Sequence, residues 1–229
     1  MEKLVYLLYK SDPQPVGPAF TRRVLDELIP ALKQAGGWGF VFNVADLNDA
    51  VRDVSPSRLA GEWEHIAGAL HFWVDSVDQR FELNPIIARV VPQSSAYLVT
   101  ESVPQKTSRT WTDGERRPGV TQLALICRAQ GVTEDEFYHN WQQVHSTQSF
   151  ALHPLRTSYV RNDVSRVLTA GAVPYRMIVL EHWAELRDFT QDERYFGSPE
   201  VVREMYRDLP GFADSSTTTT GPVSEYAVD

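Results

Sequence analysis

The sequence has one cysteine and no excess of basic residues. Cys127 cannot form an intrachain disulfide, and its place at the end of an apolar run indicates a structural thiol. The 22 Lys and Arg residues against 30 Asp and Glu give a formal charge of -8, which offers no positive field for phosphates. Nucleic acid and anionic membranes are therefore disfavoured as partners, and a small-molecule ligand is favoured.

The sequence also lacks a long hydrophobic run and the layout of a signal peptide, so we expect a cytoplasmic protein. It has no glycine-rich phosphate loop, no Gly-x-Ser-x-Gly element and no close Cys or His cluster. These absences argue against nucleotide, hydrolase and zinc chemistry, and we expect no metal site.

Short apolar runs and helical periodicities are abundant, and 42% of the residues are hydrophobic. In the first half they predict the order βαββαβ, with a turn at Asp12, Pro13 and Pro15 after the first strand. The predicted strands are 4–9, 38–44, 69–74 and 95–99, and the predicted helices are 20–32 and a segment from Asp75 through Ile87.

A polar segment then precedes a second βαββαβ order. Thr133 and Glu136 form the pattern of a capping box at the start of a helix. The other predicted elements are strands 120–128, 157–164, 177–183 and 215–226 and a helical stretch over 186–207. We therefore divide the chain into a first unit (1–104), a connector (105–118) and a second unit (119–229).

The predicted fold class is α+β, with two ferredoxin-like βαββαβ units whose sheets pack into an α+β barrel. A four-stranded sheet covered by helices on one face leaves the other face bare, and the second unit can cover it. Two pairs of residues suggest a common register between the units: Lys10 with Arg128, offset by 118, and Trp73 with Trp183, offset by 110.

The second half resembles the EthD family of the dimeric α+β barrel superfamily. The resemblance covers roughly 95 positions, from Val120 to Asp214. It rests on Cys127–Arg128, Gly131–Phe137 with Trp141 and His145, Tyr159–Asn162, Leu180–Trp183, Ser198–Pro199, Asp208 and Phe212–Asp214.

The resemblance implies a fused pseudo-dimer with one principal pocket in the second unit. The first unit departs from the motif, because helix 20–32 carries no histidine or tryptophan where the second unit has Trp141 and His145. In the third strand, His71 stands where Glu181 would be.

Trp141 and His145 lie one helical turn apart and can line one wall of a pocket. An imidazole there can act as a general base or acid near neutral pH. The alternative is that His145 caps the helix end or binds a backbone carbonyl.

Glu181 lies inside an apolar strand, where a carboxylate is costly unless it is paired or protonated. A raised pKa for acid/base work and a structural salt bridge to Arg128 or Arg161 explain it equally well.

Tyr159 and Arg161 share one strand face, so a hydroxyl and a guanidinium can bind an enolate or carboxylate oxygen together. Tyr159 is otherwise a core aromatic with a solvated tip. A further set of side chains either lines the pocket or belongs to the core. These are Phe40, His71, Trp73 and Trp183.

The favoured function is a cofactor-independent lyase, isomerase or cyclase acting on a small, largely apolar aromatic or polyketide-like carbonyl compound. His145 would be the base, Glu181 its proton partner, and Tyr159 and Arg161 the oxygen-binding groups. Three alternatives stay open: a haem-binding oxidoreductase with His145 as axial ligand, a cofactor-free monooxygenase, and a non-catalytic binding module. Exposed outer faces leave a homodimer open.

Overall fold

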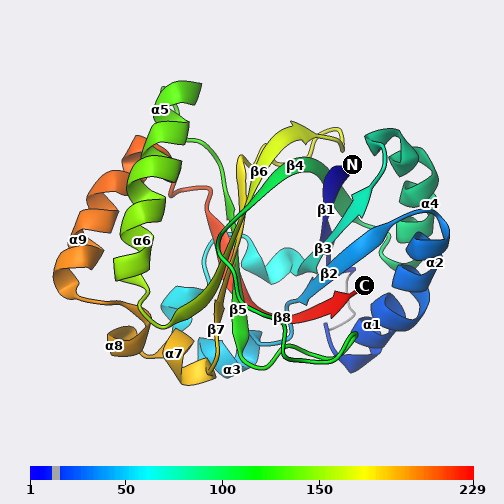
Figure 1. Ribbon diagram of the computed structural model, residues 1–229, viewed down its shortest axis with the longest axis horizontal. Coiled ribbons are helices and arrows are strands. Elements are labelled where there is room, and N and C mark those ends of the chain that lie inside the picture. The colour runs from blue at the N-terminus through cyan, green and yellow to red at the C-terminus, as the bar shows by residue number, and fades with distance from the viewer. Residues whose placement is uncertain (12–15) are drawn as a thin grey trace.

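The computed structural model describes residues 1–11 and 16–229, and its centre is a closed barrel of eight antiparallel strands (Figure 1). The predicted turn at Asp12, Pro13 and Pro15 lies outside the described residues. The order around the barrel is β1-β3-β2-β8-β5-β7-β6-β4. The strands are β1 (Glu2–Tyr9), β2 (Trp38–Val44), β3 (Ile66–Val74), β4 (Ser94–Gln105), β5 (Val120–Ile126), β6 (Arg156–Val167), β7 (Met177–Trp183) and β8 (Thr219–Val228). The predicted α+β barrel is confirmed.

Each half of the chain contributes four neighbouring strands, in the orders β4-β1-β3-β2 and β8-β5-β7-β6. Two antiparallel seams, β2 with β8 and β4 with β6, join the halves. The long strands β4 and β6 pair from Tyr97 with Val167 to Gln105 with Tyr159. The backbone groups at the edge of one half are therefore satisfied by the other, and the barrel has no open edge.

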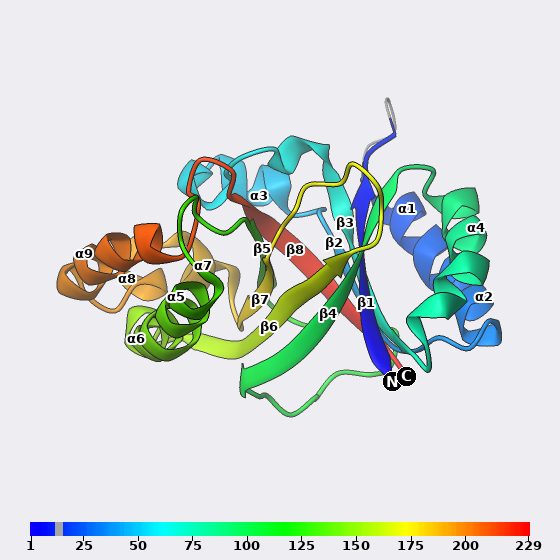
Figure 2. The ribbon, with the colours of Figure 1, turned by 90° about the horizontal axis from the view of Figure 1, so that it is seen from above.

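Helices cover the outside of the barrel at two opposite sides (Figures 1 and 2). On one side lie α1 (Pro18–Arg23), the π-helix η1 (Val24–Leu28), α2 (Ile29–Gln34) and α4 (Arg80–Val90). On the other lie α5 (Glu134–Tyr138), the π-helix η5 (His139–His145), α6 (Ser146–Leu152), α7 (Leu186–Thr190), α8 (Asp192–Tyr195) and α9 (Pro199–Asp208), and α3 (Asn48–Arg52) follows β2. In the described part of the chain, no helix has the length and apolar character needed to cross a bilayer.

Most predicted elements are present, with shifted ends. The capping box is confirmed, because Thr133 Oγ1 accepts from Glu136 N at 3.3 Å and Glu136 Oε2 accepts from Thr133 N at 2.9 Å. The stretch predicted as one helix over 186–207 is three short helices, interrupted at Gln191 and again before Pro199. The last strand begins at Thr219 and not at Ser215, because Ser216 and Thr217 form a turn on Asp214.

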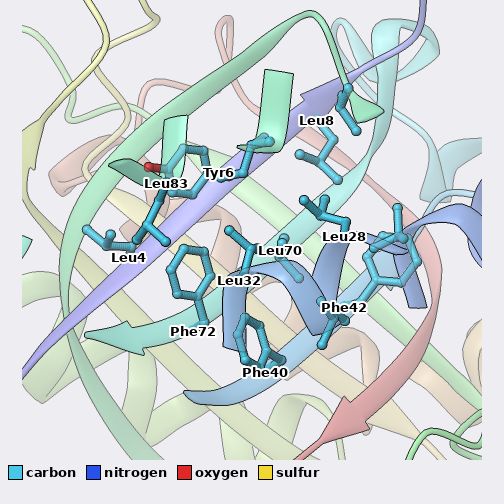
Figure 3. Packing of buried hydrophobic residues seen from close by; sticks show 14 of the residues in the cluster. Leu4, Tyr6, Leu8, Leu28, Leu32, Phe40, Phe42, Leu70, Phe72 and Leu83 are labelled. Atoms are coloured by element: carbon cyan, nitrogen blue, oxygen red, sulfur yellow. The ribbon is translucent and has the colours of Figure 1, made fainter. Parts of the chain in front are cut away.

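Successive side chains of a strand point to opposite faces, so the strands contribute to two hydrophobic cores. One core lies outside the barrel beneath the helices, and the other lies inside the barrel. Leu4, Tyr6 and Leu8 of β1 face outward and pack with the helices of the first half, as Figure 3 shows for this cluster. Val5 and Leu7 face inward and belong to the apolar part of the barrel interior. The remainder of the interior is polar and is described below.

The strand pairing corrects the predicted equivalence between the halves. In β1 and β3, Lys3 lies opposite Trp73, and in β5 and β7, Thr121 lies opposite His182. If Lys3 corresponds to Thr121, which is an offset of 118, then Trp73 corresponds to His182. The offset of the third strands is therefore 109 and not the predicted 110. Since a shift of one residue reverses the face, the pairings of Trp73 with Trp183 and of His71 with Glu181 were wrong.

Candidate active site beneath the second helical layer

Five of the predicted site residues lie together between the strands of the second half and helices η5 and α6. Tyr159 and Arg161 of β6 face the helices, and the Arg161 guanidinium lies 5.6 Å from the Trp141 ring. His145 and Glu181 are close enough for each to influence the charge of the other. The structure thus brings together one acid, one cation, one phenol, one imidazole and one indole.

The four side chains predicted as an aromatic lining lie in three different places. Phe40 packs outward against the helices of the first half, 5.3 Å from the Phe72 ring. Trp183 belongs to an aromatic cluster with Phe189 and Tyr195, next to the candidate site. His71 and Trp73 are on the barrel face of β3. The four side chains do not form one pocket wall, because Phe40 and Trp183 lie on the helix-facing sides of their strands and His71 and Trp73 lie on the barrel-facing side.

Glu181 forms a salt bridge with Arg156, which the sequence did not identify as a partner. The Arg156 side chain is 0% exposed and that of Glu181 is 13% exposed. Burial favours the neutral acid, but the Arg156 guanidinium, with His153 and His145, outweighs it and holds the pKa of Glu181 below its ordinary value. The predicted raised pKa and the predicted partners are therefore wrong: Arg128 pairs with Glu134, and Arg161 binds serines.

Arg156 reaches this site through a change of register in β6. It lies opposite Trp183, but Ser158 lies opposite His182, so the alternation is interrupted between Arg156 and Ser158. The guanidinium consequently lies on the helix side, where it donates to Ser149 Oγ at 3.2 Å and to Gln105 Oε1 at 3.0 Å. Regular alternation would have placed it inside the barrel.

Two polar groups meet at one oxygen atom in this layer. Arg161 Nη1 donates to Ser146 Oγ at 2.8 Å, and Tyr159 Oη lies 3.1 Å from the same atom. Burial raises the pKa of Tyr159, with a further contribution from Glu181, so the phenol keeps its proton at neutral pH. A cation and a protonated phenol are thus directed at one oxygen position. Ser146 was not predicted, and nothing in its sequence context marks it.

His145 ends the π-helix η5, a kind of helical turn frequent at functional sites. Its ring lies 4.9 Å from that of Phe212, and within the described residues Nδ1 is buried without a hydrogen-bond partner. Burial lowers the pKa of His145 to about 4, so the imidazole is neutral at pH 7. Because Nδ1 has no hydrogen-bond partner among the described residues, the predicted alternative of a bond from this atom to a backbone carbonyl is not observed.

A haem held by His145 requires space at the ring and a partner for the second ring nitrogen, which ligating histidines commonly give to a carboxylate or carbonyl. Nδ1 has no such partner in the described residues. Phe212, 1% exposed, lies 4.9 Å from the ring and would have to move. The residues as arranged do not fit haem. Over residues 1–11 and 16–229, no three His, Cys, Asp or Glu side chains gather as a metal site.

Comparisons with known proteins identify the fold. No protein family and no curated protein matches the sequence. A solved structure described as an anthrone oxidase-like protein is similar over 100% of this chain and 92% of its own, with a TM-score of 0.58 and 11% identity. A candidate monooxygenase from Fusobacterium nucleatum is similar over the same shares, with a TM-score of 0.54 and 6% identity. At these identities the likeness shows a shared α+β barrel fold and leaves the activity open.

Proposed function

We propose that the chain is a fused pair of ferredoxin-like units, the second of them EthD-like, and that it catalyses cofactor-independent proton transfer on a small aromatic carbonyl compound. The shared strand order of the two halves supports the first part. The convergence of Arg161 and Tyr159 on one oxygen position carries the second. The similarity to a structure described as an anthrone oxidase-like protein favours anthrone-like aromatic ketones as substrates.

The packing at His145 leaves no more room for a substrate than for haem, so Ser146 and Phe212 must first turn aside. The carbonyl oxygen of the substrate then takes the position now held by Ser146 Oγ. His145 removes a proton from the carbon next to the carbonyl, the C–H bond breaks, and the electron pair moves onto the oxygen to give an enolate. Arg161 and protonated Tyr159 stabilise the negative charge where it develops. Return of the proton from the imidazolium to another carbon completes an isomerisation.

Glu181 has a different role from the predicted one. Its lowered pKa keeps it ionised, so it is no proton donor at neutral pH. Its negative charge favours the imidazolium that forms on His145, since the carboxylate raises the histidine's affinity for a proton. Arg156 fixes the carboxylate in position. The weak basicity of His145 suits a carbon acid whose conjugate base is delocalised over an aromatic system.

Exchange of substrate hydrogen for deuterium tests this proposal. Anthrone in buffered D₂O without oxygen should lose its methylene protons faster with enzyme than without. We expect His145→Gln and Arg161→Leu each to reduce the enzymatic rate by about 100-fold or more. His65→Gln, at an exposed histidine, is the matched control and should keep the wild-type rate.

The same reaction mixture, with oxygen admitted, distinguishes the other functions. Oxygen consumption with retained exchange would identify a monooxygenase that adds dioxygen to the enolate. Binding of anthrone without any exchange above background would contradict catalysis and leave a non-catalytic binding module.

A further inference from the structure

The barrel interior contains a second polar cavity, separate from the helix-covered site. Its volume is about 80 Å³, and seven of the eight strands or their ends contribute to its wall. A groove of about 320 Å³ adjoins the start of β1 and reaches the surface beside Met1, which is 81% exposed. Lys3 and Glu101 belong to the walls of both hollows. These two side chains therefore lie between the cavity and the groove, and the proposed chemistry at His145 uses neither of them.

The strand register holds the Lys3 amine at a fixed place in this wall. Lys3 lies opposite Trp73 in β3, and Glu101 lies opposite Asn162 in β6. Lys3 Nζ forms a salt bridge with Glu101 and donates to Asn162 Oδ1 at 2.9 Å. The amide of Asn162 is itself fixed, because its Nδ2 donates to the backbone oxygen of Ile178 at 3.1 Å. The amine is thus in direct contact with a carboxylate that can accept and return protons.

Lys3 differs from the other lysines in its burial. The chain has four lysines, all within the described residues. Lys3 is 4% exposed, whereas Lys10 is partly buried and Lys33 and Lys106 are exposed. Burial lowers the pKa of Lys3, and the opposing effect of Glu101 does not fully offset it. A larger fraction of this amine is therefore unprotonated at neutral pH than in an exposed lysine, and the unprotonated amine is the form that attacks carbonyl carbons.

The remaining wall of the cavity favours an uncharged, short aliphatic ligand. Arg117 Nη1 donates to Glu225 Oε1 at 2.9 Å, so both charged pairs in the wall are compensated. A charged ligand would lose its hydration without gaining a counter-charge, which is a large cost. Val41, Val160 and Leu180 provide an apolar surface for an alkyl chain. The volume limits the ligand to about four non-hydrogen atoms, because a cavity of about 150 Å³ holds benzene.

We propose that Lys3 is a covalent binding site for short aliphatic aldehydes, which reach the amine from the groove and form an imine that places their alkyl chain in the barrel cavity. An aldehyde is uncharged, and its carbonyl carbon is the electrophile with which a lysine amine combines. Three observations support the proposal: the burial of Lys3, the contact of its amine with Glu101, and the place of both residues in the walls of the cavity and the groove.

Glu101 carries the protons in this reaction. It takes one proton from the Lys3 ammonium, and the freed lone pair forms a bond to the carbonyl carbon while the π electrons of the C=O bond move onto the oxygen. Through Glu101 the oxygen receives two protons from the nitrogen, and it leaves as water when the C=N bond forms. Lys3 keeps one N–H and its positive charge. The iminium ion therefore remains paired with Glu101, and the charge balance of the interior does not change.

Reductive trapping tests this proposal. The protein is incubated at pH 7 with limiting propanal and cyanoborohydride, and mass spectrometry of its peptides measures the rate of propylation at each lysine. We expect Lys3 to react about tenfold faster or more than the exposed Lys106, since each unit of lowered pKa raises the free-amine fraction about tenfold. Benzaldehyde has twice as many non-hydrogen atoms and exceeds the cavity, so it should not show this preference. Reaction of Lys3 with propanal no faster than that of Lys106, or an equal preference with benzaldehyde, would overturn the proposal.

Substitutions localise the reaction. Lys3→Arg keeps a cation beside Glu101 but cannot form an imine. The imine carbon signal that saturates at the lowest concentration of ¹³C-labelled propanal, measured by NMR without the reductant, should therefore disappear in this variant. Its persistence would overturn the assignment to Lys3.

Glu101→Gln should slow the propylation of Lys3 about tenfold or more, because the amide cannot carry protons. A purely structural ion pair predicts the opposite sign, since loss of the carboxylate lowers the pKa of Lys3 further and frees the amine. Glu64→Gln, at an exposed carboxylate next to Lys10, is the matched control and should keep the wild-type rate. An unchanged or faster rate in Glu101→Gln would overturn the proposal, and the comparison of the two aldehydes on the wild type keeps the test available if a variant fails to fold.

Discussion

Arg156 and Glu181 form an ion pair that is almost completely removed from water beneath α6. Removing one partner of a buried pair leaves the other charge uncompensated, which typically costs about 3 to 5 kcal/mol. We therefore expect Arg156→Leu to lower the free energy of unfolding by about 3 kcal/mol in urea denaturation. The double variant with Glu181→Leu should recover part of this loss. A loss below about 1 kcal/mol for the single variant would contradict a structural role of the pair.

The stability of the protein should fall on mild acidification. Burial lowers the pKa of His145 to about 4 and, together with Arg117, that of His182 to about 3. Between pH 6.5 and these values the unfolded chain binds protons that the folded chain does not, so stability is full above pH 6.5 and decreases as the pH falls. Below about pH 4.5, protonation of Glu181 should add to the loss.

Urea midpoints at several values between pH 7 and pH 4 measure this dependence. His145→Gln should show a shallower decrease, because one proton fewer is taken up on unfolding, and the exposed His65→Gln should follow the wild type. Equal slopes for wild type and His145→Gln would contradict a buried neutral imidazole at position 145.

Position 221, a glycine in β8, should not accept a methyl group. A Cβ atom there would lie 2.0 Å from Cε2 of Trp63, whose side chain is buried and bound through Nε1 to Asn48 Oδ1 at 2.7 Å. We expect Gly221→Ala to lower the free energy of unfolding by about 2 kcal/mol, since overpacking forces the ring or the strand to move. Gly17→Ala is the control, because a Cβ at Gly17 meets no atom within 4 Å. Equal midpoints for both variants would show that β8 does not approach Trp63 in this way.

The order of the strands along the chain could be predicted from the sequence because several strands are short apolar runs bounded by turn residues, as at 38–44 and 177–183. The pairing register could not be predicted, because a residue match such as Trp73 with Trp183 carries no information on which face a side chain takes. Arg156 was missed for a related reason. The irregularity between Arg156 and Ser158 reverses its face, and no glycine or proline marks that position.

The absorption spectrum distinguishes the two uses of His145. Because Phe212 packs against its ring, we expect no Soret band in the purified protein and none that saturates on addition of haem. A band that forms with the wild type and disappears in His145→Ala would contradict the packing described for this ring.

Stabilisation of an oxyanion at the oxygen position formed by Arg161 and Tyr159 can be measured directly. A stable phenolic ketone such as 1-hydroxyanthraquinone changes colour when its phenol ionises, so its visible spectrum reports the charge on the bound oxygen. We expect binding to shift the spectrum toward that of the phenolate at neutral pH, and we expect Arg161→Leu to bind the compound without this shift. A bound compound with the spectrum of the neutral phenol in the wild type would contradict stabilisation of an oxyanion at this site.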